Sequence, residues 1–200
     1  MSDPMPEEDI SRFYITIPQD RIGALIGPDG SVKNRLEREA GVEIDIDSNT
    51  GDVIVRSTSE TEDPFLVIKA RDFVTAVGRG FNPQVAFTLL QDDTYLEIIN
   101  LKLAVGDNPR KLNRIRGRII GRGGRTRKVI EETTGTRVTI YGKTVGIIGT
   151  YERLKVAREA LYLLIDGAKH GTVYRFLEEE ARILKMRAKS IWKKPPEELQ

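Results

Sequence analysis

The chain contains an internal repeat, and this repeat limits the possible folds more than any other feature of the sequence. Residues 22–30 (IGALIGPDG) align with residues 116–124 (RGRIIGRGG), and the same register pairs Gly41 with Gly135. Self-similarity at a fixed offset indicates that one structural unit occurs twice. The 200 residues have room for two small domains. The repeat therefore predicts two homologous units instead of one large domain.

Both units show the same order of predicted elements: strand, helix, helix, strand, strand, helix. Each opens with an alternating apolar run typical of a strand, at residues 13–17 and 95–99. Two short helices meet at a glycine loop, and a glycine that can end a helix follows the second of them. The remaining elements are predicted strands at 43–47, 52–56, 137–141 and 144–148, and closing helices at about 63–77 and 151–166. The pattern predicts an α+β fold in which each unit is a three-stranded sheet packed on three helices.

Polar stretches around the two units give the domain boundaries. We predict a flexible N-terminus at 1–11, a first domain with a connecting helix at 12–90, and a second domain at 91–170. Residues 171–200 are predicted to form a C-terminal helical extension and a flexible tail. The apolar residues of that extension fall on one helical face, at Val173, Phe176, Leu177, Ala181 and Leu184.

Both helix pairs meet at a G-x-x-G sequence, GPDG at residues 27–30 and GRGG at residues 121–124. Two glycines three positions apart let the backbone turn tightly and approach a ligand without interference from Cβ atoms. The helix that follows directs its free amides and the positive end of its dipole at that ligand. A phosphate group is the ligand that these features fit. The G-x-x-G pattern alone is common in turns, and it gains specificity from its repeated context.

Both units resemble KH domains of the type that begins with a strand and ends with a helix. The resemblance rests on the hydrophobic-Ile-Gly approach to each loop, at 25–27 and 119–121, and covers most of residues 12–78 and 95–167. In KH domains the loop clamps about four nucleotides of single-stranded nucleic acid. The resemblance also implies a groove for bases between the glycine helices and the strand that begins at residue 137.

The two units differ in charge around their loops. Between residues 110 and 128 the second unit has nine basic residues and no acidic one, whereas the matching part of the first unit mixes both signs. In the first loop Asp29 would face a phosphate, and Pro28 removes a backbone donor. We therefore expect the first loop (Gly27, Pro28, Asp29 and Gly30) to belong to a degenerate unit that serves packing or protein contacts. The second unit is predicted to bind RNA.

All predicted RNA-binding residues lie in the second unit. We expect the loop to hold the phosphodiester and nearby basic side chains to add a positive field. The KH resemblance implies a groove with an apolar floor and contacts to the edges of the nucleobases. Val129 and Ile140 are further candidates for that floor. The predicted set is Arg114, Arg118, Ile120, Gly121, Arg122, Gly123, Gly124, Arg125, Lys128, Arg137, Val138 and Thr139. Aromatic residues are scarce in it, so aliphatic contacts and hydrogen bonds would recognise the bases.

Composition and motif checks argue against an enzyme. The chain has no cysteine, which excludes disulfides and thiolate metal sites. Gly142-Lys143-Thr144 ends like a phosphate-binding P-loop, but Arg137 stands where the first glycine of that motif belongs. No histidine or carboxylate cluster has metal-ligand spacing, and no apolar run approaches the ~18 residues of a membrane span. We expect a monomeric, cytoplasmic binding protein without cofactor, metal or membrane contact.

The chain as a whole resembles the archaeal and eukaryotic Dim/Pno family, the partners of the Nob endonuclease in small-subunit ribosome assembly. The resemblance rests on the non-basic first loop, the basic second loop and the segment GAKHGTVYRFL at residues 167–177. It implies binding near the 3′ end of 16S ribosomal RNA within a pre-small-subunit particle. It also implies contacts with the Nob endonuclease and with the alpha subunit of translation initiation factor two. The compact chain resembles the archaeal members.

Two other functions fit the same residues. Both KH units and the C-terminal helix could form a protein-interaction scaffold in which RNA is secondary. The chain could also be an RNA-decay accessory protein, as exosome-associated KH proteins are. The sequence does not decide between these alternatives and the ribosomal one.

Overall fold

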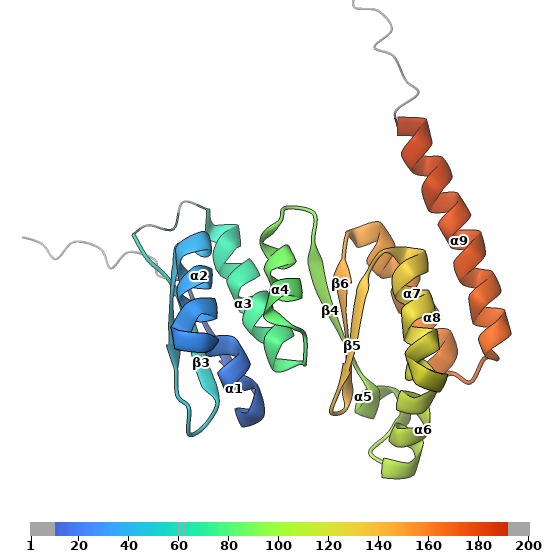
Figure 1. Ribbon diagram of the computed structural model, residues 1–200, viewed down its shortest axis with the longest axis horizontal. Helices are drawn as coiled ribbons and strands as arrows, with labels where there is room; N and C mark the ends of the chain where they lie inside the picture. The colour runs from blue at the N-terminus through green and yellow to red at the C-terminus, as the bar shows by residue number, and fades with distance from the viewer. Residues whose placement is uncertain (1–10, 60, 62, 192–200) are drawn as a thin grey trace, which may run out of the picture. The chain divides into compact units, whose positions relative to one another are not determined.

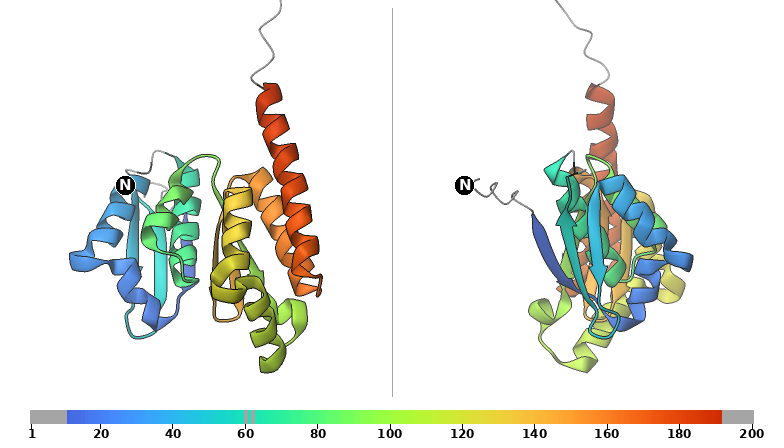
Figure 2. Two further views of the ribbon diagram at one scale, coloured as in Figure 1. Left: turned by 45° about the vertical axis from the view of Figure 1, so that its right-hand side comes forward. Right: turned by 90° about the vertical axis from the view of Figure 1, so that its left-hand side faces the viewer.

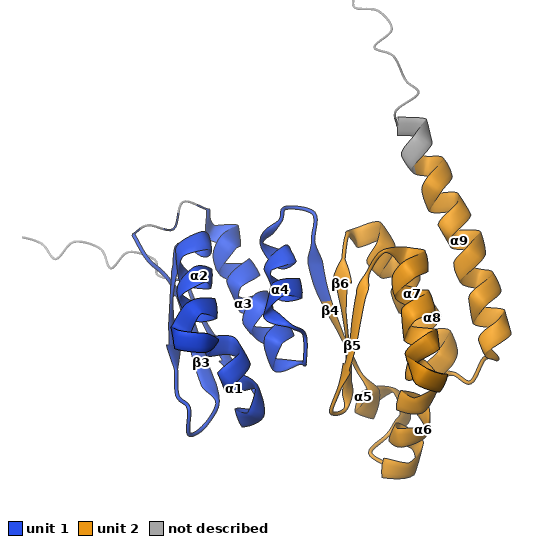
Figure 3. Cartoon of the chain, in the orientation of Figure 1, with its two compact units in different colours: residues 1–96 blue, residues 97–200 orange. Residues whose placement is uncertain are grey.

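The computed structural model describes residues 11–59, 61 and 63–191. The predicted flexible N-terminus at 1–11, except for Ser11, and the predicted flexible tail at 192–200 lie outside the described residues. The chain divides into two compact units, Met1–Leu96 and Glu97–Gln200 (Figure 3). The division falls inside a strand, β4 (Tyr95–Asn100), whose hydrogen-bonded neighbour belongs to the second unit.

The first unit has the predicted order of strands and helices (Figure 1). Its sheet is antiparallel with the strand order β1-β3-β2. Its elements are β1 (Arg12–Thr16), α1 (Gln19–Ile26), the 3₁₀ turn η1 (Pro28–Gly30), α2 (Ser31–Ala40), β2 (Val42–Ile46), β3 (Asp52–Ser57), α3 (Pro64–Gly78), α4 (Pro83–Ala86) and the 3₁₀ turn η2 (Phe87–Leu90). In β2, Val42 and Ile44 are buried while Glu43 and Asp45 are exposed, so one face of the sheet packs on the helices.

The second unit repeats this plan with the strand order β4-β6-β5. After β4 its elements are α5 (Leu101–Val105), α6 (Pro109–Ile120), the 3₁₀ turn η3 (Arg122–Gly124), α7 (Arg125–Thr134), β5 (Arg137–Tyr141), β6 (Thr144–Gly149), α8 (Tyr151–Ile165) and α9 (His170–Ile191). The predicted α+β class and the strand-first order of both units are confirmed. The short helix α5 was not predicted. It exists because the Asn100 side chain caps its start and Gly106, at φ 80°, ends it.

A glutamate that the repeat carries in both units joins the second helix to the next strand. Glu37 Oε1 accepts a hydrogen bond from the Ile44 amide at 2.9 Å, and Glu131 Oε1 accepts one from the Val138 amide at 2.9 Å. Each helix ends at a left-handed glycine, as predicted, with φ 61° at Gly41 and 71° at Gly135. The sharp stop and the carboxylate together direct the chain from the helix into the sheet.

The C-terminal helix α9 is built into the second unit. It packs against α7 and α8, and it lies beside them in the left view of Figure 2. Val173 and Leu177 are buried in the same core cluster as Ile119, Ile130 and Leu161. This packing brings the start of α9 next to the glycine loop. Among the described residues, no helix has the length and apolar composition needed to cross a membrane.

The first loop glycine of each unit is required by packing as well as by backbone conformation. At Gly27 the backbone has φ 74°, and an added Cβ would lie 2.9 Å from the Val32 amide nitrogen. We expect Gly27→Ala to lower the free energy of unfolding by about 2–3 kcal/mol, because it combines a strained φ with a backbone clash. Urea denaturation followed by circular dichroism measures this effect.

The matched control is Gly23→Ala, one turn earlier in α1, where an added Cβ meets nothing within 4 Å. Alanine favours a helix interior over glycine by about 0.5–1 kcal/mol, so this variant should be slightly stabilised. Equal stability of the two variants would contradict the packing role of Gly27.

Candidate nucleic-acid interface

The GRGG loop joins α6 to α7 through three left-handed glycines. Gly121, Gly123 and Gly124 have φ values of 74°, 59° and 79°. Gly124 is the N-cap of α7 and provides no side-chain hydrogen bond to the first turn of that helix. The first amides of α7 are therefore without a side-chain cap at the loop, as an anion-binding helix start requires.

The loop glycines have different roles. A Cβ at Gly121 would lie 2.7 Å from the Thr126 amide nitrogen, whereas a Cβ at Gly123 or Gly124 would meet nothing within 4 Å. Gly121 thus closes the helix pair, and the other two leave open space over the loop. A ligand phosphate has room to approach the backbone at Gly123 and Gly124.

Three of the predicted arginines are available to an anionic ligand. Arg114, Arg122 and Arg125 are exposed, and no ion pair joins them to a carboxylate within the part of the chain that the structure describes. Lys128 and Glu132 form a loose pair at 3.7 Å, which is weak because both side chains are exposed. Lys128 therefore also remains accessible.

Arg118 has a structural role that the sequence did not reveal. Its Nε donates to the Leu164 carbonyl at 3.1 Å, and its Nη2 donates to the Ala168 carbonyl. These bonds cap the carbonyls at the end of α8 and join α6 to the start of α9. The first unit has the same arrangement with Arg21, whose guanidinium donates to the Val77 and Phe81 carbonyls.

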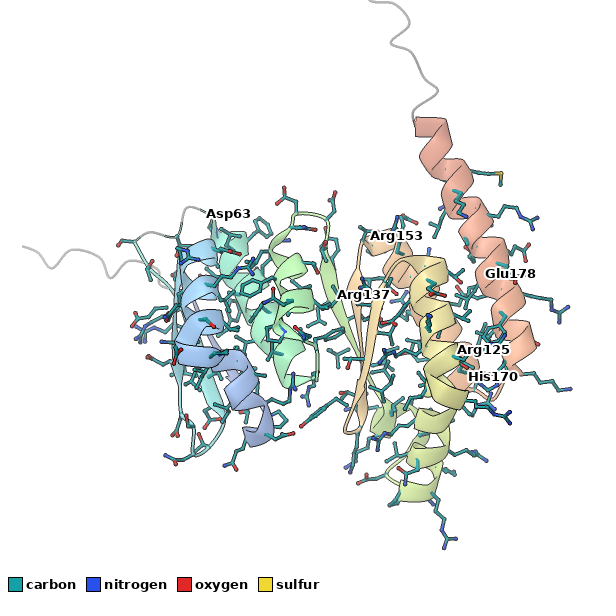
Figure 4. The ribbon with its side chains drawn as sticks, in the orientation of Figure 1. Asp63, Arg125, Arg137, Arg153, His170 and Glu178 are labelled. Atoms are coloured by element: carbon teal, nitrogen blue, oxygen red, sulfur yellow. The ribbon has the colours of Figure 1, made fainter. Side chains whose placement is uncertain are left out.

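The residues predicted for the base groove are divided between surface and core. Arg137 is exposed at the start of β5 (Figure 4), and Ile120 at the end of α6 is 37% exposed. Thr139 is half-buried. Val138 is only 3% exposed and belongs to the core cluster, because strand alternation turns it away from the groove. Its predicted contact with RNA is therefore not available in this fold.

The two loops have almost the same backbone conformation but differ in their side chains. Gly27 and Gly121 share φ 74° and ψ 173°, and Asp29 (φ 50°, ψ 30°) matches Gly123 (φ 59°, ψ 27°). Aspartate is one of the few residues that adopts this left-handed conformation at low cost. The first unit thus keeps the shape of the loop and places a carboxylate where the second unit leaves space.

A hollow of about 540 Å³ lies beside the GRGG loop, on the side toward α9. Its charged lining consists of Arg114, Arg118, Arg122 and Arg125. His170 and Tyr174 of α9 complete it, and Figure 4 shows Arg125 and His170 close together. Sequence analysis predicted the arginines but not the α9 residues, because only the docking of α9 on α7 brings them to the loop.

Other titratable groups lie outside this region. Asp107 Oδ1 accepts from Lys143 at 2.6 Å and Oδ2 pairs with Lys102 at 3.0 Å. Hydrogen bonds from these two lysines hold the pKa of Asp107 below its ordinary value. Asp107, the only carboxylate between α5 and α6, therefore stays ionised, and its negative charge is paired with two lysines. Among the described residues, no group of histidine and carboxylate side chains has the arrangement of a metal site.

Comparisons with known proteins give the same domain organisation. Residues 95–182 match the profile of the second KH domain of PNO1, a eukaryotic-type KH domain (KH-domain type I), and residues 11–92 match the Krr1 KH1 domain. The chain is thus a tandem KH-domain protein.

Relatives identify a particular family. The chain is 43% identical to the KH domain-containing protein MJ0443 of Methanocaldococcus jannaschii, over 94% of this chain and 82% of that protein. It is 30% identical to the pre-rRNA-processing protein PNO1 of Coccidioides immitis, over 89% of this chain and 70% of that protein. The structure of an a/eIF2alpha-aDim2p-rRNA complex from Pyrococcus horikoshii matches with TM-score 0.84 and 49% identity, covering 88% of this chain and 97% of that one. The chain belongs to the PNO1/Dim2 family.

The guanidinium of Arg118 tethers α6 to the end of α8 through its bonds to the Leu164 and Ala168 carbonyls. A substitution that removes these bonds but keeps the charge should therefore lower stability. Arg118→Lys keeps the positive charge but cannot donate to both carbonyls, so we expect the free energy of unfolding to fall by about 1–2 kcal/mol. The control Arg114→Lys changes an arginine on the same helix that makes no such bonds, and its stability should equal that of the wild type. Thermal melts of both variants test this. A stable Arg118→Lys protein would show that the two hydrogen bonds do not hold α6 to α8.

Proposed function

We propose that this protein binds single-stranded RNA through the GRGG loop of its second KH unit during ribosome biogenesis. The observation that carries the proposal is the open space over Gly123 and Gly124, flanked by arginines that pair with no carboxylate of the described residues. Backbone amides at an uncapped helix start and guanidinium groups are the donors that phosphodiesters prefer. These features support the proposed clamp, from which we leave out the buried Val138.

The first unit is proposed to contribute protein contacts instead of an RNA clamp. Its loop has the same shape, but the Asp29 carboxylate occupies the position of Gly123 and Pro28 lacks an amide proton. A carboxylate that close to a phosphate repels it strongly. Binding of RNA by this loop is therefore disfavoured by charge, not by shape.

The RNA target follows from the relatives and not from the geometry. The relatives include a pre-rRNA-processing protein, and a solved structure that matches holds a Dim2 protein with rRNA and the alpha subunit of initiation factor two. We infer that this chain binds the 3′-end region of 16S ribosomal RNA in a pre-small-subunit particle. Its proposed protein partners are the alpha subunit of initiation factor two and the Nob endonuclease. It is proposed to act by binding alone, without catalysis.

An aspartate in the second loop should abolish RNA binding while leaving the fold intact. Gly123→Asp places a carboxylate in the open space, and Asp29 shows that aspartate fits this backbone. We expect affinity for a short RNA from the 3′ end of 16S rRNA to fall at least tenfold, or about 1.4 kcal/mol or more. Fluorescence polarisation measures the affinity, and circular dichroism checks the fold.

The charge-matched control is Ser48→Asp, an exposed position in the first unit. It should leave the affinity unchanged. If both variants bind as the wild type does, the loop is not the RNA site, and a scaffold function is favoured. Equal affinity for a scrambled RNA would retain RNA binding and remove the reason for the 16S target.

The salt dependence of binding reports how many phosphates the protein holds. If about four phosphates are in contact, the slope of log K against log salt should be roughly −3 for a single strand. A slope near zero would mean that phosphate contacts do not drive the binding. The same fluorescence titration at four or more salt concentrations gives this value.

A further inference from the structure

We propose that the hollow between the GRGG loop and α9 is a second phosphate site, which takes a phosphate of the same RNA strand beyond the nucleotides held by the loop. We call it the arginine pocket; Arg114, Arg118, Arg122 and Arg125 line it together with Thr126 and Tyr174. This inference rests on the proposed function and extends it to a longer stretch of RNA.

The pocket lies on a different side of the loop from the base groove. Arg114, Arg118 and Gly121 follow one another at helical spacings of four and three, so they share one face of α6 and its end. Ile120 is two positions from Arg118, which turns it about 200° around the helix axis. None of the groove residues Ile120, Arg137 and Thr139 lines the pocket. A strand that fills the groove therefore leaves the pocket free.

The lining of the pocket is suited to a phosphate. It has four arginines and no carboxylate among the described residues, and guanidinium groups match phosphate oxygens in pairs. Arg118 is held in place by its bonds to Leu164 and Ala168, which gives the site one fixed cation. The helices α7 and α9 begin at this site, so the positive ends of two helix dipoles add to the same field.

The floor of the pocket has a pair of hydroxyl groups, one buried and one half-buried. Thr126 is 2% exposed, and its Oγ1 lies 3.0 Å from the Tyr174 hydroxyl. Two hydroxyl groups have two protons, and the bond between them uses one. The second proton is available for a hydrogen bond to a ligand oxygen. In the first unit Val32 stands in the place of Thr126, so the fold does not require a polar side chain at this position.

The arginines of the pocket have no basic counterparts in the first unit. In the register of the repeat, their counterparts are Asp20, Ala24, Pro28 and Ser31. Outside the pocket Arg127 has a basic counterpart in Lys33, whereas Arg110, Lys111, Arg116 and Lys128 correspond to Thr16, Ile17, Ile22 and Asn34. The two loops share one backbone conformation, so the arginines are not needed to form it. Four of the eight basic residues at 110–128 that have no basic counterpart in the first unit line this one pocket, which indicates a ligand that the first unit does not bind.

The test compares RNAs of two lengths on two double variants. A four-nucleotide RNA fills the loop, and the same RNA extended by four nucleotides at its 5′ or 3′ end reaches beyond it. Arg114→Gln/Arg125→Gln removes two charges from the pocket. Arg110→Gln/Lys111→Gln removes two charges from exposed positions in the first turn of α6, outside the pocket. The quantity measured is the ratio of the affinities for the long and the short RNA.

In the wild type we expect this ratio to be at least ten for one of the two extensions, and the salt slope to be steeper by about 0.7 for the extra phosphate. The pocket variant should bring the ratio close to one and remove the extra slope, whereas the control variant keeps both. Long RNAs with and without a terminal phosphate distinguish a terminal phosphate from an internal phosphodiester. Either source supports the site.

Two results would overturn the proposal. If both double variants change the ratio equally while the short RNA still binds, the pocket is not a phosphate site and the loop clamp stands. If the wild type does not bind the short RNA, the proposed function fails and the pocket fails with it. Tyr174→Phe provides a second readout in case the arginine variant does not fold, because it removes only the hydroxyl and should lower the ratio several-fold. An unchanged ratio in that variant would contradict the proposal that the hydroxyl pair of the floor donates a hydrogen bond to the phosphate.

Discussion

The close contact between the first loop glycine and the helix that follows it is the constraint on which each unit depends. At Gly27 and Gly121 the backbone is left-handed, and the missing Cβ lets the amide of the residue five positions later approach. This contact sets the angle between the two short helices. It also leaves the start of the second helix at the surface, without a side-chain cap. The geometry proposed to bind phosphate is therefore a consequence of how the helix pair is closed.

Because the backbone of the loop is fixed by packing, its chemistry can change independently. Asp29 adopts nearly the conformation of Gly123, and the first unit remains folded around a loop that carries a carboxylate. The fold of the two units is thus the same, while only the second has a loop region with basic and no acidic residues. At the loop itself the difference lies in exposed side chains, Asp29 in the first unit and Arg122 in the second, so it does not alter the core.

The sequence predicted the parts of the structure that depend on local pattern. The repeat, the strand alternation and the glycine at the end of the second helix sufficed for the element order of both units, which the structure confirms. The placement of Val138 in the core depends on the strand phase relative to the helices, which one unaligned strand does not reveal. The roles of Arg118 and Tyr174 depend on contacts with residues about fifty positions away, and no local pattern encodes them.

The two tether arginines show how a structural contact became part of the candidate site. Arg21 and Arg118 cap equivalent carbonyls at the end of the third helix, yet they occupy different positions in the repeat, about one helical turn apart. In the second unit the tether stands one turn closer to the loop, so its guanidinium also lines the pocket. The same cation then satisfies helix-end carbonyls and adds to the field at the loop. If the proposed function is correct, stability and RNA affinity are consequently coupled at Arg118, whereas they are separable at Arg114 and Arg125, for which no such bonds are found among the described residues.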